Sequence, residues 1–360
     1  MKPLKRVLIM AGGTGGHVFP GLAVARQLNA NGVEVHWLGT SSGLEARLVP
    51  AENIPLHIVN VQGLRGKGIR KLLSAPLRLA FALRQSLSVI NKIKPDVVMG
   101  MGGFVSGPGG LASWLASRPL IIHEQNAKAG LTNKVLAHFA RRVLEGFPDA
   151  FRQQAKVMAV GNPVRSEMEA FAPPHQRFQT KKTPFRLLII GGSLGAQGLN
   201  DIVPRALALL KEEERPEVWH QTGEKHLAAA QQTYAELGVK AKLMPFIDDM
   251  PAAYQFADMV LCRAGASTIA ELCTVGLGAI LVPYPFAVDD HQTANADFMV
   301  KNGAARCIQQ SALTDTLLAD IIREFSAAPE KRLAMAEAAY QLRMPDVAAR
   351  IYQILCEVVN

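Results

Sequence analysis

The sequence is poor in cysteine, and the few cysteines it has are not grouped. Four of its 360 residues are cysteines, all in the second half, and no two of them form a C-x-x-C pair. This usage excludes a disulfide framework and a cysteine-based zinc site, and it favours a reducing compartment. A content of 49% hydrophobic and 19% charged residues is typical of a globular protein with a substantial core, and the length suggests two domains.

A long hydrophobic run is also missing. The start, MKPLKRVLIM, has too short an apolar run for a secretory leader, so we expect no signal peptide. Residues 97–117 are uncharged over a length close to that of a membrane span, but they contain six glycines and Pro108. We therefore expect a strand, a loop and a short helix there instead of a membrane-spanning segment.

Acidic residues are scarce in the first half only. Residues 1–162 carry a net charge of +13, whereas residues 163–360 carry −4. The positive excess either covers an ordinary solvated surface or meets an anionic partner, such as phosphate groups or an acidic membrane face. Because the chain has no arginine-rich run and no aromatic RNA-binding signature, we expect no nucleic-acid partner.

Three common ligand signatures are absent. No segment matches the triphosphate-binding pattern G-x-x-x-x-G-K-[ST], and the nearest, GLRGKG at 63–68, has the wrong spacing. The dinucleotide pattern fails because Val18 stands where its third glycine belongs, so we do not expect NAD. The chain has no D-x-D pair, no H-E-x-x-H and no other metal-ligand spacing, so we expect no bound metal.

The sequence does contain a regular alternation of short apolar strands and helical stretches, which predicts doubly wound parallel sheets of the α/β class. The two halves repeat one plan of strand, glycine-rich turn and helix, so we predict two similar domains with a boundary between Gly161 and Pro184. The expected strands lie at 6–11, 34–39, 55–60, 96–101, 120–124, 142–145, 185–190, 217–221, 241–246, 258–262 and 279–283.

Three glycine-rich turns follow expected strands: GGTGG at 12–16, GMGGFVSGPGG at 100–110 and GGSLGAQG at 191–198. Glycine lets the backbone approach a ligand closely, and the free N–H groups at the start of the next helix favour an anion. A single turn of this kind is as compatible with a tight connection that binds nothing. Three of them together favour a phosphate or diphosphate ligand.

Four further features have both a functional and a structural interpretation. A neutral His17 at a helix start is a candidate base, or it packs against its neighbours. In HEQN, at 123–126, polar residues end an expected strand, where ligand crevices lie. In CRAGASTIAE, Glu271 is a candidate ribose ligand, or it forms a capping box with Thr268. Residues 65–94 have eight basic and no acidic residues among leucines, which suits an anionic membrane surface or a core-packed helix with a basic outer face.

The glycine turns belong to a longer series of motifs. MAGGTGGHVFPGLAVA, GLRGKG, PDVVMGMGGFVSGPGG, HEQN, GNPVR, GGSLGAQ, FIDDM, CRAGASTIAE and DDHQTANA follow one another in this order over nearly the whole chain. In combination they closely resemble the MurG family of bacterial glycosyltransferases of peptidoglycan synthesis. The resemblance implies a GT-B fold, in which two Rossmann-like domains face one another across a cleft. The first domain would be 1–162, joined by a C-terminal helix at 346–360, and the second 163–345.

The resemblance also implies the reaction. N-acetylglucosamine would pass from UDP-N-acetylglucosamine to the C4 hydroxyl of the N-acetylmuramoyl unit of lipid I, the undecaprenyl-diphosphate-linked pentapeptide precursor. The anomeric centre would invert, giving lipid II and UDP, with no metal and no cofactor. The enzyme would lie peripherally on the anionic cytoplasmic face of the bacterial inner membrane, through residues 65–84, with other cell-wall synthesis proteins as candidate partners. The alternative is a UDP-sugar epimerase of the same two-domain architecture.

Carried over by position, the motifs give each site residue a role. Glu271 would hold the ribose hydroxyls, the backbone of Ile247 the uracil, and Ser193 with Arg165 the diphosphate. His17 is the expected catalytic base, with Glu124 as the alternative. The expected donor-binding residues are Thr14, Gly15, Gly16, Asn126, Arg165, Ser193, Ile247, Ala266, Ser267, Thr268, Glu271 and Gln292, and the expected acceptor-binding residues are Gly13, Gly102, Gly103, Phe104 and Ser106.

Overall fold

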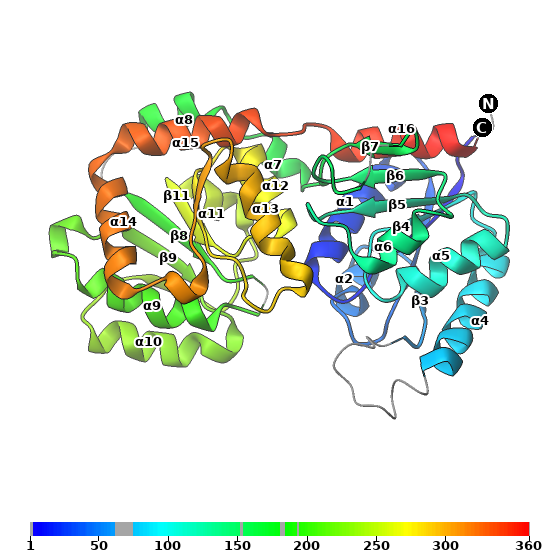
Figure 1. The fold of residues 1–360 in the computed structure, drawn as a ribbon, viewed down its shortest axis with the longest axis horizontal. Helices are drawn as coiled ribbons and strands as arrows, with labels where there is room; N and C mark the ends of the chain where they lie inside the picture. The colour runs from blue at the N-terminus through cyan, green and yellow to red at the C-terminus, as the bar shows by residue number, and fades with distance from the viewer. Residues whose placement is uncertain (1–2, 62–74, 152–153, 181–183, 193, 360) are drawn as a thin grey trace. The chain divides into compact units, whose positions relative to one another are not determined.

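The chain forms two compact units in a computed structural model, which describes residues 3–61, 75–151, 154–180, 184–192 and 194–359 (Figure 1). The first unit comprises Met1–Val164 and Asp346–Asn360, and the second comprises Arg165–Pro345. Each unit has its own parallel sheet, so each is described separately. The uncharged stretch at 97–117 is a strand followed by a short helix, as predicted.

The first unit contains a seven-stranded parallel sheet in the order β3-β2-β1-β4-β5-β6-β7. Its strands are β1 (Arg6–Met10), β2 (Glu34–Gly39), β3 (Leu56–Ile58), β4 (Val97–Gly100), β5 (Leu120–Glu124), β6 (Arg142–Glu145) and β7 (Val157–Ala159). Its helices are α1 (Gly15–Ala30), α2 (Glu45–Ala51), α4 (Ala75–Ile93), α5 (Ser106–Leu115), α6 (Leu131–Leu136) and α16 (Val347–Val359).

Alternate residues of these strands are buried on opposite faces of the sheet, which explains their nearly continuous apolar composition. Leu8 and Val98 pack with residues of α4, α5 and α6. On β2, the ring of Trp37 lies so close to Gly21 of α1 that a Cβ there would be 2.6 Å from it. Helix α16 packs on α1 and belongs to this unit although the whole second unit precedes it (Figure 1).

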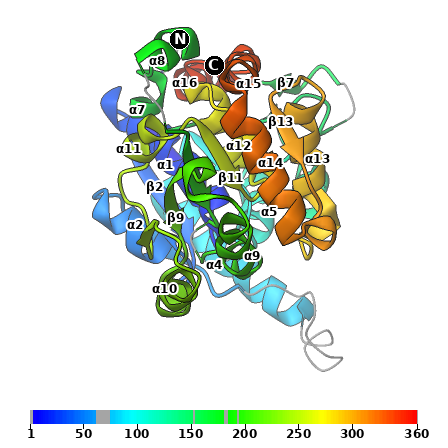
Figure 2. The same cartoon turned by 90° about the vertical axis from the view of Figure 1, so that its left-hand side faces the viewer.

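The second unit repeats the plan with a six-stranded parallel sheet in the order β10-β9-β8-β11-β12-β13. Its strands are β8 (Arg186–Ile190), β9 (Glu217–Gln221), β10 (Lys242–Met244), β11 (Met259–Cys262), β12 (Ala279–Leu281) and β13 (Ala305–Cys307). Its helices are α7 (Ser166–Glu169), α8 (Pro174–Thr180), α9 (Gln197–Ala208), α10 (Leu227–Glu236), α11 (Met250–Phe256), α12 (Ala266–Val275), α13 (His291–Val300), α14 (Asp315–Ala327) and α15 (Pro329–Gln341). Helices α9 and α14 lie side by side and share one core with β8 and β11 (Figure 2).

The sequence analysis missed two strands, β7 and β13. Each is three residues long and forms the last edge of its sheet. The exposed Arg306 interrupts the apolar run at β13. Length and edge position alone do not explain the two omissions, because β3 and β10 are equally short edge strands and were predicted. The eleven expected strands are all present, with ends shifted by up to two residues.

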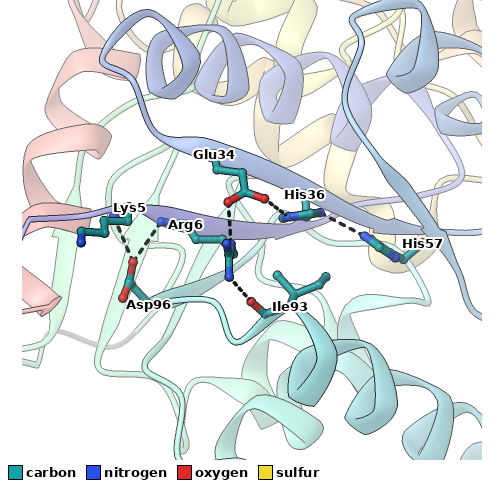
Figure 3. A network of polar contacts seen from close by, with 7 residues as sticks. All are labelled: Lys5, Arg6, Glu34, His36, His57, Ile93 and Asp96. Atoms are coloured by element: carbon teal, nitrogen blue, oxygen red, sulfur yellow. Dashed lines mark hydrogen bonds and ion pairs between the residues drawn. The ribbon is translucent and has the colours of Figure 1, made fainter.

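A polar network ties the amino ends of the strands together in the first unit (Figure 3). The carboxylate of Asp96 accepts from the backbone N–H groups of Lys5 and Arg6, and the Arg6 side chain donates to Glu34. Glu34 also bonds His36, whose Nδ1 lies 3.1 Å from Nε2 of His57. These contacts join β1, β2, β3 and the segment before β4 at the end of the sheet opposite to the glycine turns, so we assign them a structural role.

Candidate active site

The glycine turns and the start of α12 lie where the strand order reverses in each sheet. In the first unit the chain leaves β1 toward β2 and returns to β4 on the other side of β1, and in the second unit the same reversal occurs at β8 and β11. Ligands bind outside the carboxyl ends of the strands at such points. Turns 12–16 and 101–105 follow β1 and β4, and turns 191–196 and 263–265 follow β8 and β11.

The structure brings the two glycine turns of the first unit into contact. Gly103 has a φ of +81°, and a Cβ on it would lie 2.4 Å from the carbonyl oxygen of Gly12. Gly102 has a φ of +102°, and a Cβ there would lie 2.5 Å from the ring of His17. The close approach of backbone to backbone and of ring to backbone is possible only with glycine at both positions.

The His17 ring is held between its own helix and the second turn. Its Nδ1 lies 3.5 Å from the hydroxyl oxygen of Thr14, the residue before α1, and the ring edge with Cδ2 and Nε2 faces Gly102. This arrangement places the His17 ring beside both glycine turns. Phe104, the residue after Gly103 in the second turn, is exposed.

A buried carboxylate, which the sequence analysis missed, supports the first glycine turn. Glu45 of α2 is fully buried. Its Oε2 accepts from the N–H of Gly13 at 3.0 Å, and its Oε1 accepts from the N–H and the hydroxyl of Thr40 at 3.0 and 2.7 Å. The segment SSGLEARL offers no motif that would identify this role, because Gly13 lies 32 residues before Glu45.

Ser106 is buried at the start of α5, and its hydroxyl is used within the protein. It donates to the carbonyl oxygens of Met10 and Gly102 at 3.1 and 2.8 Å and accepts from the N–H of Gly102 at 3.2 Å. These bonds fix the second glycine turn to the end of β1. Ser106 therefore shapes the turn. Its hydroxyl already makes hydrogen bonds within the protein, so its expected contact with the acceptor substrate stays a prediction.

The HEQN motif forms a hydrogen-bonded polar cluster at the end of β5, centred on the Glu124 carboxylate. Glu124 accepts four bonds, from the N–H and the side-chain amide of Asn126, from the N–H of Gly130 and from the amide of Asn133, at 2.9 to 3.1 Å. His123 is fully buried, donates from Nε2 to the carbonyl of Gly161, and has its pKa lowered by burial to about 4. This geometry suits Glu124 for fixing the loop that carries Asn126, and it leaves little room for proton transfer.

In the second unit, the turn after β8 is packed as tightly as the first. Gly195 has a φ of +77°, and a Cβ on it would lie 2.0 Å from the carbonyl oxygen of Thr222. The side chain of Gln221 donates to the carbonyl of Gly192 at 2.9 Å. The expected diphosphate ligand Ser193 lies outside the described residues.

The start of α12 has the features of an anion site. Its N-cap is Gly265, with no side-chain cap, and Ala266, Ser267 and Thr268 form its first turn. The hydroxyl oxygen of Ser267 is buried and has no hydrogen-bond partner among the described residues. Free backbone N–H groups and an unsatisfied hydroxyl at the positive end of a helix together favour a phosphate group.

Glu271 is not part of a capping box, contrary to one of its two interpretations. A box would need Thr268 at the N-cap, but the N-cap is three residues earlier. Instead, Oε2 of Glu271 accepts from the hydroxyl of Tyr254 at 2.8 Å. Burial raises the pKa of Glu271, while the charge of Arg165 and the Tyr254 bond lower it. Arg165 immediately precedes α7, which packs on α12, so it lies in the same unit as Glu271.

Ile247 and Gln292 are further donor candidates of the second unit. Ile247 is buried in the loop before α11. The side-chain oxygen of Gln292, at the start of α13, accepts from the N–H of Tyr284 at 2.8 Å. Among the residues that the structure describes, no group of three or more His, Cys, Asp or Glu side chains is arranged to hold a metal ion.

The chain is similar to known glycosyltransferases in sequence and in structure. Residues 7–145 match the glycosyltransferase family 28 N-terminal domain, and residues 186–351 match the glycosyltransferase family 28 C-terminal domain. A Marinobacter nauticus protein named UDP-N-acetylglucosamine--N-acetylmuramyl-(pentapeptide) pyrophosphoryl-undecaprenol N-acetylglucosamine transferase is 52% identical over 358 residues, 99% of each chain. The crystal structure of Acinetobacter baumannii MurG matches with a TM-score of 0.85 at 41% identity, over 98% of this chain and 99% of that one. The glycotransferase of kitacinnamycin, 17% identical with a TM-score of 0.69 over 98% and 99% of the chains, shares the fold.

Contact between the two glycine turns can be tested by a matched pair of substitutions. Gly103→Ala places a Cβ against the carbonyl of Gly12, whereas Gly13→Ala, at a φ of +92°, meets nothing within 4 Å. Gly13→Ala should lower the free energy of unfolding by about 1 kcal/mol through backbone strain. Gly103→Ala should lower it by about 2 kcal/mol more, because backbone must shift. Urea unfolding measures both, and equal losses would contradict the contact.

Proposed function

The chain belongs to glycosyltransferase family 28, and we propose that it transfers N-acetylglucosamine from UDP-N-acetylglucosamine to lipid I. The acceptor is the C4 hydroxyl of the N-acetylmuramoyl unit, and the products are lipid II and UDP. The observation that carries this function is the 52% identity to a named transferase over 99% of both chains. A UDP-sugar epimerase is not favoured, because relatives at about this identity over nearly the whole chain carry the transferase name.

The second unit binds the donor. The ribose hydroxyls donate to Glu271, and the backbone beside Ile247 pairs with the uracil. The diphosphate lies at the first turn of α12, where Ser267 has a buried, unsatisfied hydroxyl, with Arg165 and Ser193 completing its contacts. Supporting this assignment, the positive charge of Arg165 lowers the pKa of the Glu271 carboxyl, which places the two residues at one site of the second unit.

The remaining donor contacts are assigned by motif position. Ala266 and Thr268 share the first turn of α12 with Ser267 and lie along the nucleotide. Thr14, Gly15, Gly16, Asn126 and Gln292 contact the sugar or close over it.

The first unit binds the acceptor. The diphosphate of the acceptor accepts hydrogen bonds from the backbone N–H groups of the turns at 12–16 and 102–105. The residues around it are Gly13, Gly102, Gly103 and Phe104. His17 removes the proton from the C4 hydroxyl as that oxygen attacks the anomeric carbon from the face opposite UDP, which inverts the centre. Glu124 is the less suitable base because its oxygens already accept four bonds, and we assign it the positioning of Asn126.

Departure of UDP leaves negative charge on the diphosphate. The positive end of α12, its free N–H groups and Arg165 stabilise that charge without a divalent ion. This proposal is supported by the chemistry of the residues at the start of α12 and by the positive charge of Arg165 near Glu271.

A surface patch of the first unit suits the anionic cytoplasmic face of the bacterial inner membrane. At the start of α4, Leu77 and Phe81 are 77% and 55% exposed, and Arg78 between them is exposed as well. The later part of the same helix packs into the core through Ala82 and Ile90, so both interpretations of the basic stretch apply to different parts of it. Trp114 is exposed at the end of α5, which packs on α4.

Exposed apolar side chains among arginines bind membrane surfaces peripherally. Residues 65–74 of the basic stretch lie outside the described residues. Across the described part of the chain, no helix is long and apolar enough to cross a membrane.

The reaction is tested by UDP release from UDP-N-acetylglucosamine, with and without a short-chain lipid I analogue. Release should require the analogue and yield a disaccharide. His17→Ala should lower kcat by about 100-fold or more with donor affinity unchanged, because it removes the base and not the donor site. The exposed histidine of the same unit provides the control, His138→Ala, which should retain activity. Conversion of the donor to another sugar without an acceptor would instead establish the epimerase.

The membrane patch is tested by flotation with vesicles of phosphatidylglycerol and phosphatidylethanolamine. Replacing Leu77 and Phe81 together by Glu should reduce the bound fraction at least about tenfold, because each apolar side chain contributes about 2 kcal/mol on burial. The matched control replaces Leu209 and Leu237, exposed apolar residues of the second unit, by Glu. Unchanged flotation of the first double variant, or equal loss in both, would refute this surface.

A further inference from the structure

We propose that Tyr254 is a positioning residue of the donor site, whose buried hydroxyl holds the Glu271 carboxylate in place for the two ribose hydroxyls. The proposal rests on the proposed function, in which Glu271 is the ribose ligand. Tyr254 lies on α11 and Glu271 on α12, and the hydroxyl donates to Oε2 at 2.8 Å.

Glu271 needs such a partner more than an exposed glutamate would. Its side chain has several rotatable bonds, and holding one rotamer costs conformational entropy unless a contact selects it. Its burial also raises its pKa, which favours a protonated carboxyl that accepts fewer hydrogen bonds from the ligand. The Tyr254 bond counters both effects, since it selects one rotamer and favours the ionised form.

Tyr254 is suited to donate and to do nothing else. Its side chain is fully buried, and burial together with the Glu271 charge raises its pKa well above the usual value for tyrosine. The hydroxyl therefore remains protonated, and its single proton points to Oε2. Because Tyr254 does not use Oε1, that oxygen is not committed to it and can accept from a ribose hydroxyl.

The same helix links ribose recognition to base recognition. Asp249 caps α11 by accepting from the N–H of Ala252 at 3.0 Å, and Ile247, the proposed uracil contact, lies two residues before this cap. The short segment from 247 to 254 thus carries both the base contact and the residue that orients Glu271. A nucleoside with a ribose should therefore be distinguished from its 2′-deoxy form through Tyr254 as well as through Glu271.

The experiment is calorimetric titration of the full chain with UDP and with 2′-deoxy-UDP. Four proteins are compared: the wild type, Tyr254→Phe, Glu271→Gln and Tyr234→Phe. Tyr234 is the matched control, because it is a buried tyrosine of the same unit whose hydroxyl bonds His220 at 3.0 Å instead of Glu271.

The wild type should bind UDP more tightly than 2′-deoxy-UDP. Tyr254→Phe should weaken UDP binding about tenfold and change 2′-deoxy-UDP binding little, because a hydrogen bond to a charged group is lost and the ribose contact loosens. The ratio of UDP affinity to 2′-deoxy-UDP affinity in Tyr254→Phe should fall toward the ratio in Glu271→Gln. Tyr234→Phe should keep the wild-type ratio.

A second readout is the pH dependence of UDP binding. Burial raises the pKa of Glu271, and the two groups that lower it are Arg165 before α7 and Tyr254 on α11. Ribose binding uses the carboxylate, so affinity is lost as the pH falls through the pKa of Glu271. Because Tyr254→Phe removes a bond that lowers this pKa, the loss should begin at a higher pH than in the wild type.

Two outcomes would overturn the positioning role. The first is that Tyr254→Phe keeps the wild-type ratio of UDP affinity to 2′-deoxy-UDP affinity and the wild-type pH profile. The second is that Tyr254→Phe loses affinity for both ligands equally, which would indicate damage to packing alone. If Glu271→Gln itself keeps the wild-type ratio while UDP still binds, the ribose assignment fails and the role of Tyr254 fails with it. If the wild type binds neither ligand, the proposed donor site fails as a whole.

Discussion

The close approach of backbone to backbone at the carboxyl ends of the strands is the constraint on which the rest of the structure depends. In the first unit a Cβ on Gly103 would lie 2.4 Å from the carbonyl of Gly12, and in the second a Cβ on Gly195 would lie 2.0 Å from the carbonyl of Thr222. Only glycine permits these contacts. They leave the main-chain N–H groups of neighbouring turns near one another at the point where each sheet reverses its strand order, which is where a diphosphate can be bound.

Buried carboxylates also stabilise the loops of the site, by accepting hydrogen bonds. Glu45 and Glu124 are both buried, and each accepts several bonds from main-chain N–H groups or amides. Neither is available to a substrate, yet each fixes a loop that carries proposed site residues, namely the first glycine turn and Asn126. Glu271 differs from them, because it accepts a bond from the hydroxyl of Tyr254 and a ribose can supply further bonds. We thus assign ligand binding to Glu271 and the positioning of loops to Glu45 and Glu124.

The sequence was sufficient to predict the two doubly wound sheets, since buried parallel strands are apolar throughout and their turns are rich in glycine. It was also sufficient to place the glycine turns, the HEQN loop and the start of α12 at strand ends. It did not predict β7 and β13, although it placed β3 and β10, which are equally short edge strands. Nor could it find Glu45 or Tyr254, whose roles arise from contacts between residues that are 32 and 17 positions apart. The capping-box pattern at Thr268 was misleading, because an earlier glycine begins the helix.

The central claim is that the diphosphate of the donor lies on the first turn of α12 in the second unit. A crystal structure of the full chain with UDP tests it most directly. The account predicts a phosphate oxygen within hydrogen-bond distance of the Ser267 hydroxyl and of backbone N–H groups of that turn, with the ribose on Glu271. A diphosphate seated instead on the 12–16 turn of the first unit, with Ser267 still unsatisfied, would contradict it.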